Sequence, residues 1–194
     1  MGYHIYTTDG IILKRKVFGE ADVLLFILTK DLGLISASAK SARLDISKLK
    51  GSLQEYQFVT ISCVHGKNGW KITSVADKGS FYFNFPETHR KVLVQISDLL
   101  LQMITGELVH QEIFETVKTG YEYLATIKSE EIANLETLLV LRILHELGYV
   151  AKDSEIFEFT KNPTYWSEEL LLEVEKSKKN IILMINKGIK ESHL

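Results

Sequence analysis

The hydrophobic pattern of this 194-residue chain changes its period near residue 80, and this change limits the possible folds more than any other feature. Before residue 80, short apolar runs rich in Val, Ile, Thr and aromatic residues alternate with turn signals, which is typical of β-strands. After residue 88, apolar residues recur about every 3.5 positions, as in amphipathic helices. The pattern predicts an α+β protein with a strand domain at 1–80 and a helical domain at 81–194.

Five strands are expected in the first domain. The apolar runs lie at 5–18, 21–29, 33–40, 57–66 and 69–76. The turn between the last two contains Asn68 and Gly69, which tolerate the positive φ of a tight hairpin. Five short strands with a polar, partly helical connection between the third and fourth predict an OB-fold, a five-stranded Greek-key barrel. An SH3-like barrel is the structural alternative.

The second domain is expected to contain helices at 89–105, 111–127, 132–149, 166–177 and 179–191. The third of these is apolar nearly all round, so we expect it to be the central, buried helix. No apolar run reaches the ~20 residues needed to cross a bilayer, and we expect no membrane partner. The single cysteine suggests a reducing compartment.

The usual signatures of catalysis and metal binding are missing from the sequence. The glycines are too sparse for a phosphate-binding loop, and "HELGY" has Tyr149 where a zinc protease needs a second histidine. Cys63 and His65 could form a nucleophile and its base, but a lone cysteine in a strand is more often a small buried hydrophobe. We therefore expect no enzyme activity, no cofactor and no metal.

The charge is distributed unevenly between the two domains. Residues 1–80 contain 11 Lys and Arg against 7 Asp and Glu, whereas residues 81–194 contain 12 against 18. The basic residues cluster at the end of the first strand and after the third, positions that can border the nucleic-acid groove of an OB-fold. The predicted phosphate contacts are Lys40, Arg43, Lys14, Arg15, Lys48 and Lys50. The alternative is a solvated surface connection.

Four aromatic residues of the first domain could stack on bases: Tyr6, Phe18, Tyr56 and Trp70. The alternative for each of them is packing in the core of the barrel. Phe18, Tyr56 and Trp70 are kept as the candidate stacking residues.

The order of residues from Gly10 to Tyr56 resembles the N-terminal domain of the bacterial recombination mediator family RecO. The family pattern is matched by Gly10, Ile11, Ile12, Leu13, Phe18, Glu20, Asp22, Thr29, Gly33, Ala39, Lys40, Ala42, Arg43, Ser47, Leu53 and Gln54. "LRILHELGY" further resembles the central helix of that family. Two departures stand out: Ser41 occupies a position that is usually glycine, and the four zinc-binding cysteines of many members are absent.

The resemblance implies a non-enzymatic DNA repair and recombination protein of the cytoplasm and nucleoid. Such a protein would bind single- and double-stranded DNA, anneal complementary strands, engage the C-terminal tail of single-strand-binding protein, and assist RecA loading together with RecR. Arg142, in an otherwise apolar helix, is the candidate contact for that acidic tail; the alternative is a helix-edge residue with a packed stem. Two other functions stay open, a protein-interaction adaptor and an RNA-binding OB-fold protein.

Overall fold

The computed structural model describes residues 4–44, 51–83, 85–151 and 156–191. The chain divides into two compact units. The barrel unit comprises residues 1–84 and 105–111, and the helical unit comprises residues 85–104 and 112–194. The predicted boundary after residue 80 lies at the end of the last strand, whereas the return of residues 105–111 to the barrel unit was not indicated by the sequence.

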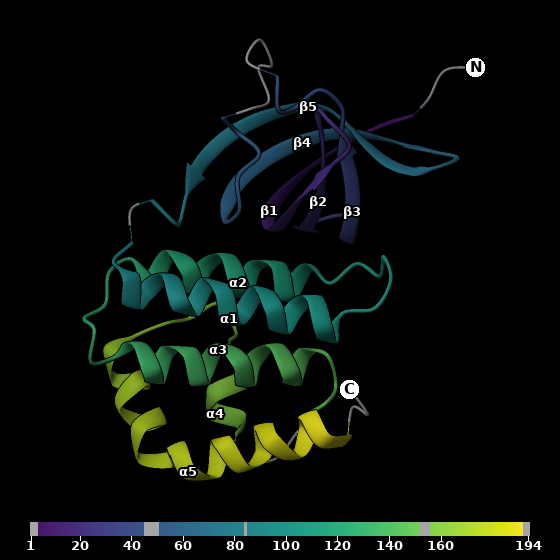
Figure 1. Ribbon diagram of the computed structural model, residues 1–194. Coiled ribbons are helices and arrows are strands. Elements are labelled where there is room, and N and C mark those ends of the chain that lie inside the picture. The colour runs from purple at the N-terminus through teal and green to yellow at the C-terminus, as the bar shows by residue number, and fades with distance from the viewer. Residues whose placement is uncertain (1–3, 45–50, 84, 152–155, 192–194) are drawn as a thin grey trace. The chain divides into compact units, whose positions relative to one another are not determined.

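Five strands form a closed barrel in the order β1-β2-β3-β5-β4 (Figure 1). Their bounds are β1 Ile5–Phe18, β2 Asp22–Thr29, β3 Gly33–Ala39, β4 Gln57–Gly66 and β5 Gly69–Ser80. All neighbours pair antiparallel except β3 and β5, which run parallel. This is the strand order of an OB-fold, so the predicted α+β fold with an N-terminal OB-fold is confirmed.

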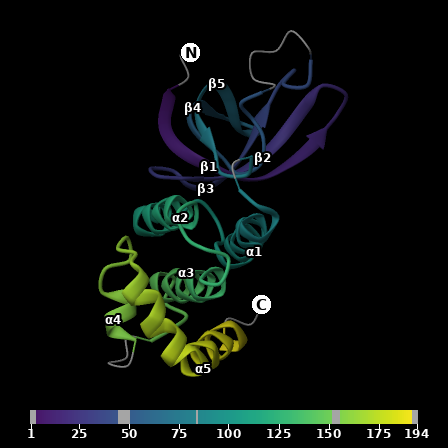
Figure 2. The same ribbon diagram turned by 90° about the vertical axis from the view of Figure 1, so that its left-hand side faces the viewer.

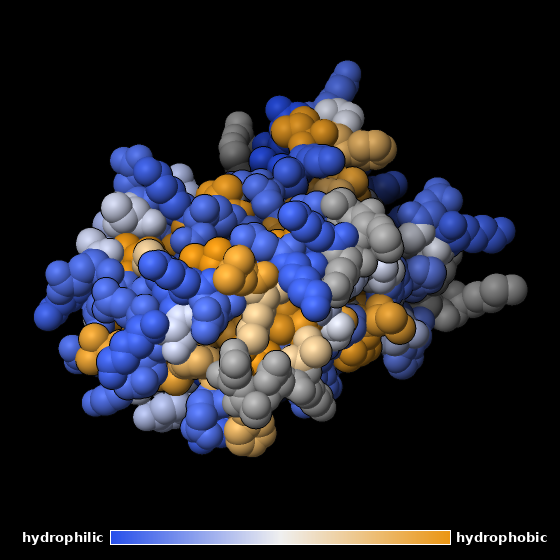
Figure 3. Space-filling model, turned by 90° about the horizontal axis from the view of Figure 1, so that it is seen from below, coloured by the Kyte–Doolittle hydropathy of each residue, from blue (hydrophilic) through white to orange (hydrophobic). Residues whose placement is uncertain are grey.

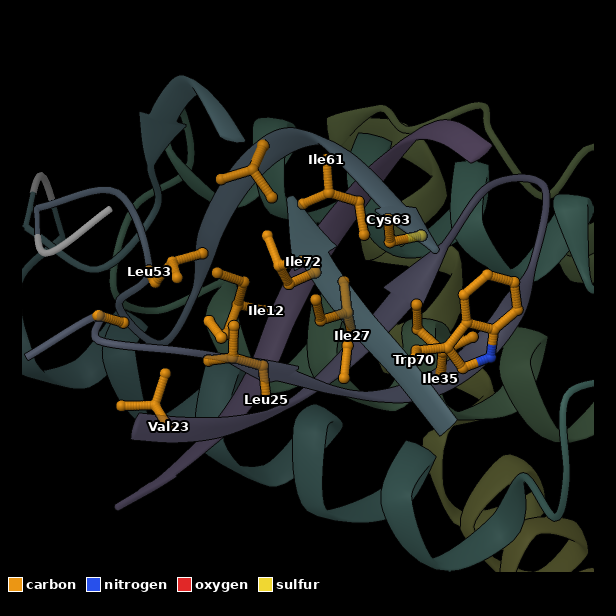
Figure 4. Close-up of a cluster of buried hydrophobic side chains, with 14 residues drawn as sticks. Ile12, Val23, Leu25, Ile27, Ile35, Leu53, Ile61, Cys63, Trp70 and Ile72 are labelled. Carbon is orange, nitrogen blue, oxygen red and sulfur yellow. The ribbon is translucent and has the colours of Figure 1, made fainter. Parts of the chain in front are cut away.

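Successive side chains of each strand point to opposite faces, so alternate residues fill the interior of the barrel. On β2 and β3 the alternate residues Val23, Leu25 and Ile35 are fully buried, while the residues between them are partly exposed. Figure 4 shows the resulting core, with Val23 and Leu53 at one end and Ile35 and Trp70 at the other. Burying each large aliphatic side chain contributes roughly 1.5–3 kcal/mol.

Trp70 closes one end of this core. It is 7% exposed, and its indole Nε1–H donates to Glu107 Oε1 at 2.9 Å. Glu107 belongs to the segment 105–111, which packs on the barrel beside Gly33. Gly33 has a φ of 73°, and a Cβ placed there would lie 2.2 Å from the carbonyl oxygen of Leu108. The segment can approach this closely only because residue 33 has no side chain.

The helical unit is built around α3. Its helices are α1 Glu87–Met103, α2 Gln111–Leu124, α3 Ile132–Glu146, α4 Phe157–Thr160 and α5 Glu168–Glu191. Figures 1 and 2 show α3 in a middle layer, with α1 and α2 on one side and α4 and α5 on the other. Both sides of α3 are covered, which agrees with its nearly all-round apolar sequence. The prediction that this helix is central and buried is confirmed.

The prediction of two separate helices at 166–177 and 179–191 is wrong, since α5 is a single helix of 24 residues. The polar run from Ser177 to Asn180 interrupts the apolar sequence, but the buried stripe continues from Val174 to Ile181, two turns further along. Lys178 stays half-buried within this run and donates to Asn134 Oδ1 at 2.9 Å. The short helix α4 was not expected.

The molecular face that carries α5 is largely hydrophilic, with small hydrophobic areas between charged side chains (Figure 3). Leu172 and Leu183 are exposed large apolar residues of this helix. Among the described residues, none of the helices combines the length and apolar character needed to span a bilayer.

The close approach of residues 105–111 can be tested at Gly33. We expect Gly33→Ala to lower the free energy of unfolding by roughly 2–4 kcal/mol, because it adds a clash to the cost of a positive φ. Gly106→Ala is the matched control, since its φ is 78° with no atom within 4 Å of the new Cβ. It should cost about 1 kcal/mol. Equal urea midpoints for the two variants would show that the Gly33 contact is unimportant.

Candidate nucleic-acid interface

The outer face of β1, β2 and β3 carries a row of cations beside apolar and hydroxyl side chains. The register pairs Lys14 with Phe26 and Lys16 with Leu24 across β1 and β2. Phe26 and Leu24 in turn pair with Ser36 and Ser38 on β3. We define the outer face by these six residues. Both lysines and Ser36 are exposed, and the other three are partly exposed, so the face is open to solvent within the barrel unit.

Lys16 is positioned by a contact with the aromatic ring of Phe26. The ammonium group of Lys16 lies 5.3 Å from the centroid of the Phe26 ring, within the range of a cation–π contact. Lys14 and Lys16 are two residues apart on one strand, so their backbone positions are separated by about 7 Å. A row of cations at this spacing can neutralise successive phosphates, and the face of strands 2 and 3 is where OB-folds bind oligonucleotides.

The loop after β3 continues this basic surface toward the turn between β1 and β2. Lys40 and Arg43 are both exposed. The Arg43 guanidinium Nη1 donates to the carbonyl oxygen of Glu20 at 2.8 Å, and its backbone N–H donates to Ala21 O at 3.0 Å. Arg43 therefore fixes the loop against the β1–β2 turn, while Lys40 is the more available of the two cations.

The backbone conformation of Ser41, in the middle of this loop, is one that glycine adopts easily. Its φ is 54°, in the left-handed region that favours glycine. The Ser41 backbone N–H donates to Asp22 Oδ1 at 2.8 Å, which holds the loop in this conformation. The departure from the family pattern at Ser41 thus keeps the backbone geometry that a glycine would adopt, at the cost of local strain.

Arg15 lies on the opposite side of β1 from Lys14 and Lys16. It pairs with Leu25, whose side chain is inside the barrel, and it is half-buried. Its backbone N–H donates to Glu55 Oε1 at 2.8 Å, and its Nε is buried without a hydrogen-bond partner among the described residues. The prediction placed Lys14 and Arg15 in one phosphate-binding group, but strand alternation separates them. Lys48 and Lys50, also predicted contacts, lie outside the described residues.

The predicted stacking residues occupy different environments. Phe18 is 61% exposed at the end of β1. Tyr56 is 8% exposed and stacks on Tyr82 with ring centroids 5.6 Å apart. Trp70 belongs to the barrel core and contacts Tyr6 edge to face. The placement of Tyr56 and Trp70 corresponds to core packing, the alternative considered for both, and leaves Phe18 as the stacking candidate with an open ring face.

Arg142 is a structural residue of the helical unit in this conformation. It is 1% exposed, and its ring neighbour Trp166 lies 4.3 Å from the guanidinium carbon. Its Nε donates to Phe159 O at 2.8 Å, and its Nη1 donates to the carbonyl oxygens of Pro163 and Tyr165. Burial lowers the pKa of the Arg142 guanidinium to about 10, so it stays charged at neutral pH. These contacts do not support the predicted role in binding an acidic tail.

A pocket of about 630 Å³ lies next to Arg142. Its lining includes Glu158, Glu169 and Glu173 as well as Lys161. Lys161 itself forms an ion pair with Glu158. Three carboxylates make this pocket a poor match for an acidic peptide, because like charges disfavour binding.

Cys63 and His65 do not form a nucleophile and base. Cys63 is fully buried in the barrel core, and burial raises the pKa of its thiol to about 11. His65 is exposed, and its ring contacts the edge of Trp70 with centroids 4.7 Å apart. In the described ranges, no group of three or more His, Cys, Asp or Glu side chains is arranged to hold a metal ion.

Leu24, Phe26, Ser36 and Ser38 were not predicted from the sequence as part of the site. Lys16 was not among the predicted phosphate contacts. The alternation of β1 could have separated Lys14 and Lys16 from Arg15, because residues two apart share a face. The pairing of Lys14 with Phe26 requires the strand register, and a bulge between Ile12 and Lys14 shifts that register. A one-residue shift exchanges the two faces of a strand.

The closed strand order defines this domain as an OB-fold, and its outer face carries the exposed lysines Lys14 and Lys16. Residues 1–79 match the family model described as "Recombination protein O N terminal". The N-terminal domain of this chain therefore matches the N-terminal domain of RecO proteins, and the resemblance predicted from the sequence is confirmed.

Curated relatives extend the similarity into the helical unit. The chain is 28% identical over 149 residues to the DNA repair protein RecO of Heliobacterium modesticaldum, covering 75% of this chain and 52% of the relative. It is 44% identical over 64 residues to the DNA repair protein RecO of Dehalococcoides mccartyi, covering 33% of this chain and 25% of the relative. A third RecO, from Gloeobacter violaceus, is 26% identical over 129 residues. The matched regions thus span about half the length of these relatives, or less.

The burial of the Cys63 thiol can be tested through its reactivity. A buried thiol with a pKa near 11 is almost fully protonated at pH 8, so we expect it to react with Ellman's reagent only after unfolding in guanidinium chloride. One equivalent should react in denaturant. Fast reaction of the native protein at pH 8 would mean that the thiol is accessible and activated.

The structural role of Arg142 can be tested with Arg142→Lys, which keeps the charge and loses the planar fork. We expect the free energy of unfolding to fall by roughly 1–3 kcal/mol, because lysine cannot reach three carbonyl oxygens in the same geometry. Urea unfolding followed by circular dichroism measures the change. An unchanged midpoint would mean that the guanidinium contacts contribute little, and a role in binding a partner would regain support.

Proposed function

We propose that this protein is a non-enzymatic DNA repair and recombination protein that binds DNA on the outer face of β1–β3 and on the adjacent loop. The match of its N-terminal domain to that of RecO proteins supports the DNA repair role. The single observation that carries the DNA-binding assignment is the row formed by Lys14 and Lys16 on an open sheet face, with Lys40 in the loop beyond β3.

Binding on this face would depend on phosphates more than on base identity. Each lysine that neutralises a phosphate releases condensed counterions, so affinity falls as salt rises. Ser36 adds a hydroxyl group that can donate to a phosphate oxygen, whereas the Ser38 hydroxyl already donates to the Trp70 carbonyl oxygen. Both single- and double-stranded DNA carry the required backbone, so the proposal includes both. Leu24 and Phe26 would cover sugar or base surface between the charges.

The finer activities are proposed by analogy with the family. They are annealing of complementary strands, engagement of the C-terminal tail of single-strand-binding protein, and loading of RecA together with RecR. An annealing protein needs to hold a strand without reading its sequence, and a phosphate-directed face suits that requirement. The matched region covers about half of the Heliobacterium relative, and the contacts of Arg142 commit this residue to the fold of the helical unit and not to the tail of single-strand-binding protein.

The proposal predicts a charge-dependent affinity that is specific to the barrel lysines. We expect the triple variant Lys14→Ala/Lys16→Ala/Lys40→Ala to bind a fluorescent single-stranded oligonucleotide more weakly. The slope of log Kobs against log salt should become less negative by about 2, because each lost phosphate contact removes about 0.7. Fluorescence anisotropy across a salt series measures both quantities.

The matched control is Lys128→Ala/Lys179→Ala/Lys190→Ala, which removes the same charge from exposed positions of the helical unit. It should leave the slope unchanged. If the two triple variants weaken binding equally, the affinity depends on the net charge of the protein and not on the barrel lysines. If the native protein does not bind DNA at low salt, a protein-interaction adaptor is favoured. Clear preference for an RNA oligonucleotide of the same sequence would favour the RNA-binding function.

A further inference from the structure

The turn between β1 and β2 carries large apolar side chains in the open. Val17 is 59% exposed and Phe18 is 61% exposed, and Leu44 in the neighbouring loop is 43% exposed. Single exposed apolar residues are common, but here two adjacent ones end a strand and directly follow the basic residues Lys14, Arg15 and Lys16. We call residues 17–22 the hairpin tip.

The hairpin tip is held rigidly. The β1–β2 ladder continues to its last residues, pairing Val17 with Val23 and Phe18 with Asp22. Gly19 has a φ of 61°, which allows the tight reversal that follows. The contacts of Arg43 with Glu20 and Ala21, and of Ser41 with Asp22, tie the loop after β3 to the tip. The apolar side chains therefore project from a braced hairpin.

Phe18 stands at the end of the lysine row. Residues 14, 16 and 18 alternate onto the same side of β1, so a strand bound along Lys14 and Lys16 would meet the Phe18 ring next. A phenyl ring has no polar group to satisfy, and its face can stack on a base. Within a continuous duplex both faces of each base pair are already stacked. Only the last pair at a junction, or an unpaired base, offers a free face.

The surrounding charges favour nucleic acid over a protein partner at the tip. Three cations, Lys16, Lys40 and Arg43, flank the tip against the two carboxylates of Glu20 and Asp22, and the Asp22 carboxylate accepts a hydrogen bond from the Ser41 backbone N–H. Proteins that open or bend DNA insert apolar side chains between bases while cations hold the backbone.

We propose that the hairpin tip is a wedge that binds the junction between double- and single-stranded DNA, with Phe18 stacked on the terminal base pair. This inference rests on the proposed DNA-binding function and adds the substrate class that the same face prefers. Junction binding would let the protein act where two strands begin to pair or separate.

The test uses a forked duplex with 2-aminopurine at the first base pair, together with a blunt duplex and a single strand. We expect the native protein to bind the fork more tightly than the blunt duplex and to change the 2-aminopurine fluorescence. Phe18→Ala should weaken fork binding by about tenfold, abolish the fluorescence change, and leave the salt slope unaltered. Ile5→Ala is the matched control, because Ile5 is 60% exposed near the other end of β1. It should behave like the native protein.

The outcomes separate this inference from the proposed function. If Phe18→Ala binds the fork as the native protein does while the lysine triple variant is weakened, the wedge is wrong and DNA binding stands. If Phe18→Ala weakens fork and blunt duplex equally, Phe18 is a general contact and the junction preference is wrong. If the native protein binds none of the three DNAs, the proposed function fails together with the wedge.

Discussion

The short parallel pairing of β3 with β5 is the constraint on which the barrel depends. It joins Ala37 to Trp70 and Ser38 to Lys71, and it completes a sheet that is otherwise antiparallel. The Ser38 hydroxyl donates to the Trp70 carbonyl oxygen at 3.3 Å, and the Trp70 indole fills the adjacent end of the core. Closing the sheet removes its exposed edges, which would otherwise pair with other chains.

Closure of the barrel also determines which basic side chains are accessible from solvent. In a closed barrel each strand residue either fills the interior or faces solvent. Lys14 and Lys16 face out, whereas Arg15 lies on the inner side and is half-buried. Arg43 is exposed but holds the β1–β2 turn through the Glu20 carbonyl oxygen. A sequence cluster of like charges is thus divided by the fold into solvent-facing residues and residues with structural contacts.

Local patterns were sufficient to predict the strands and most of the helices. The range of β1 agrees with the prediction from Ile5 to Phe18, because Val, Ile and Thr enrichment and the flanking turns are encoded locally. The position of Trp70 was harder, because a residue beside a turn becomes buried only through pairing with a strand about 30 residues earlier. Arg142 is similar, since its three carbonyl partners lie between residues 159 and 165.

The charged residues of the helical unit are arranged differently from those of the barrel. Its buried cation stabilises the connection from α4 to α5, and the pocket beside it is lined by more carboxylates than cations. The basic first 80 residues form the barrel strands, and the acidic helical unit places three carboxylates in the pocket beside Arg142. This distribution of charge agrees with the proposed binding of DNA by the barrel. The acidic helical unit is less suited to binding DNA.

The proposed binding of DNA to the outer face of β1–β3 can be located residue by residue in solution. The most direct measurement is a ¹⁵N-resolved NMR titration of the native protein with a short single-stranded oligonucleotide. We expect the largest amide shift changes to fall on residues 14–18, 22–26, 36–38 and 40–43. Shift changes concentrated on residues 112–191, with the barrel resonances unmoved, would contradict it.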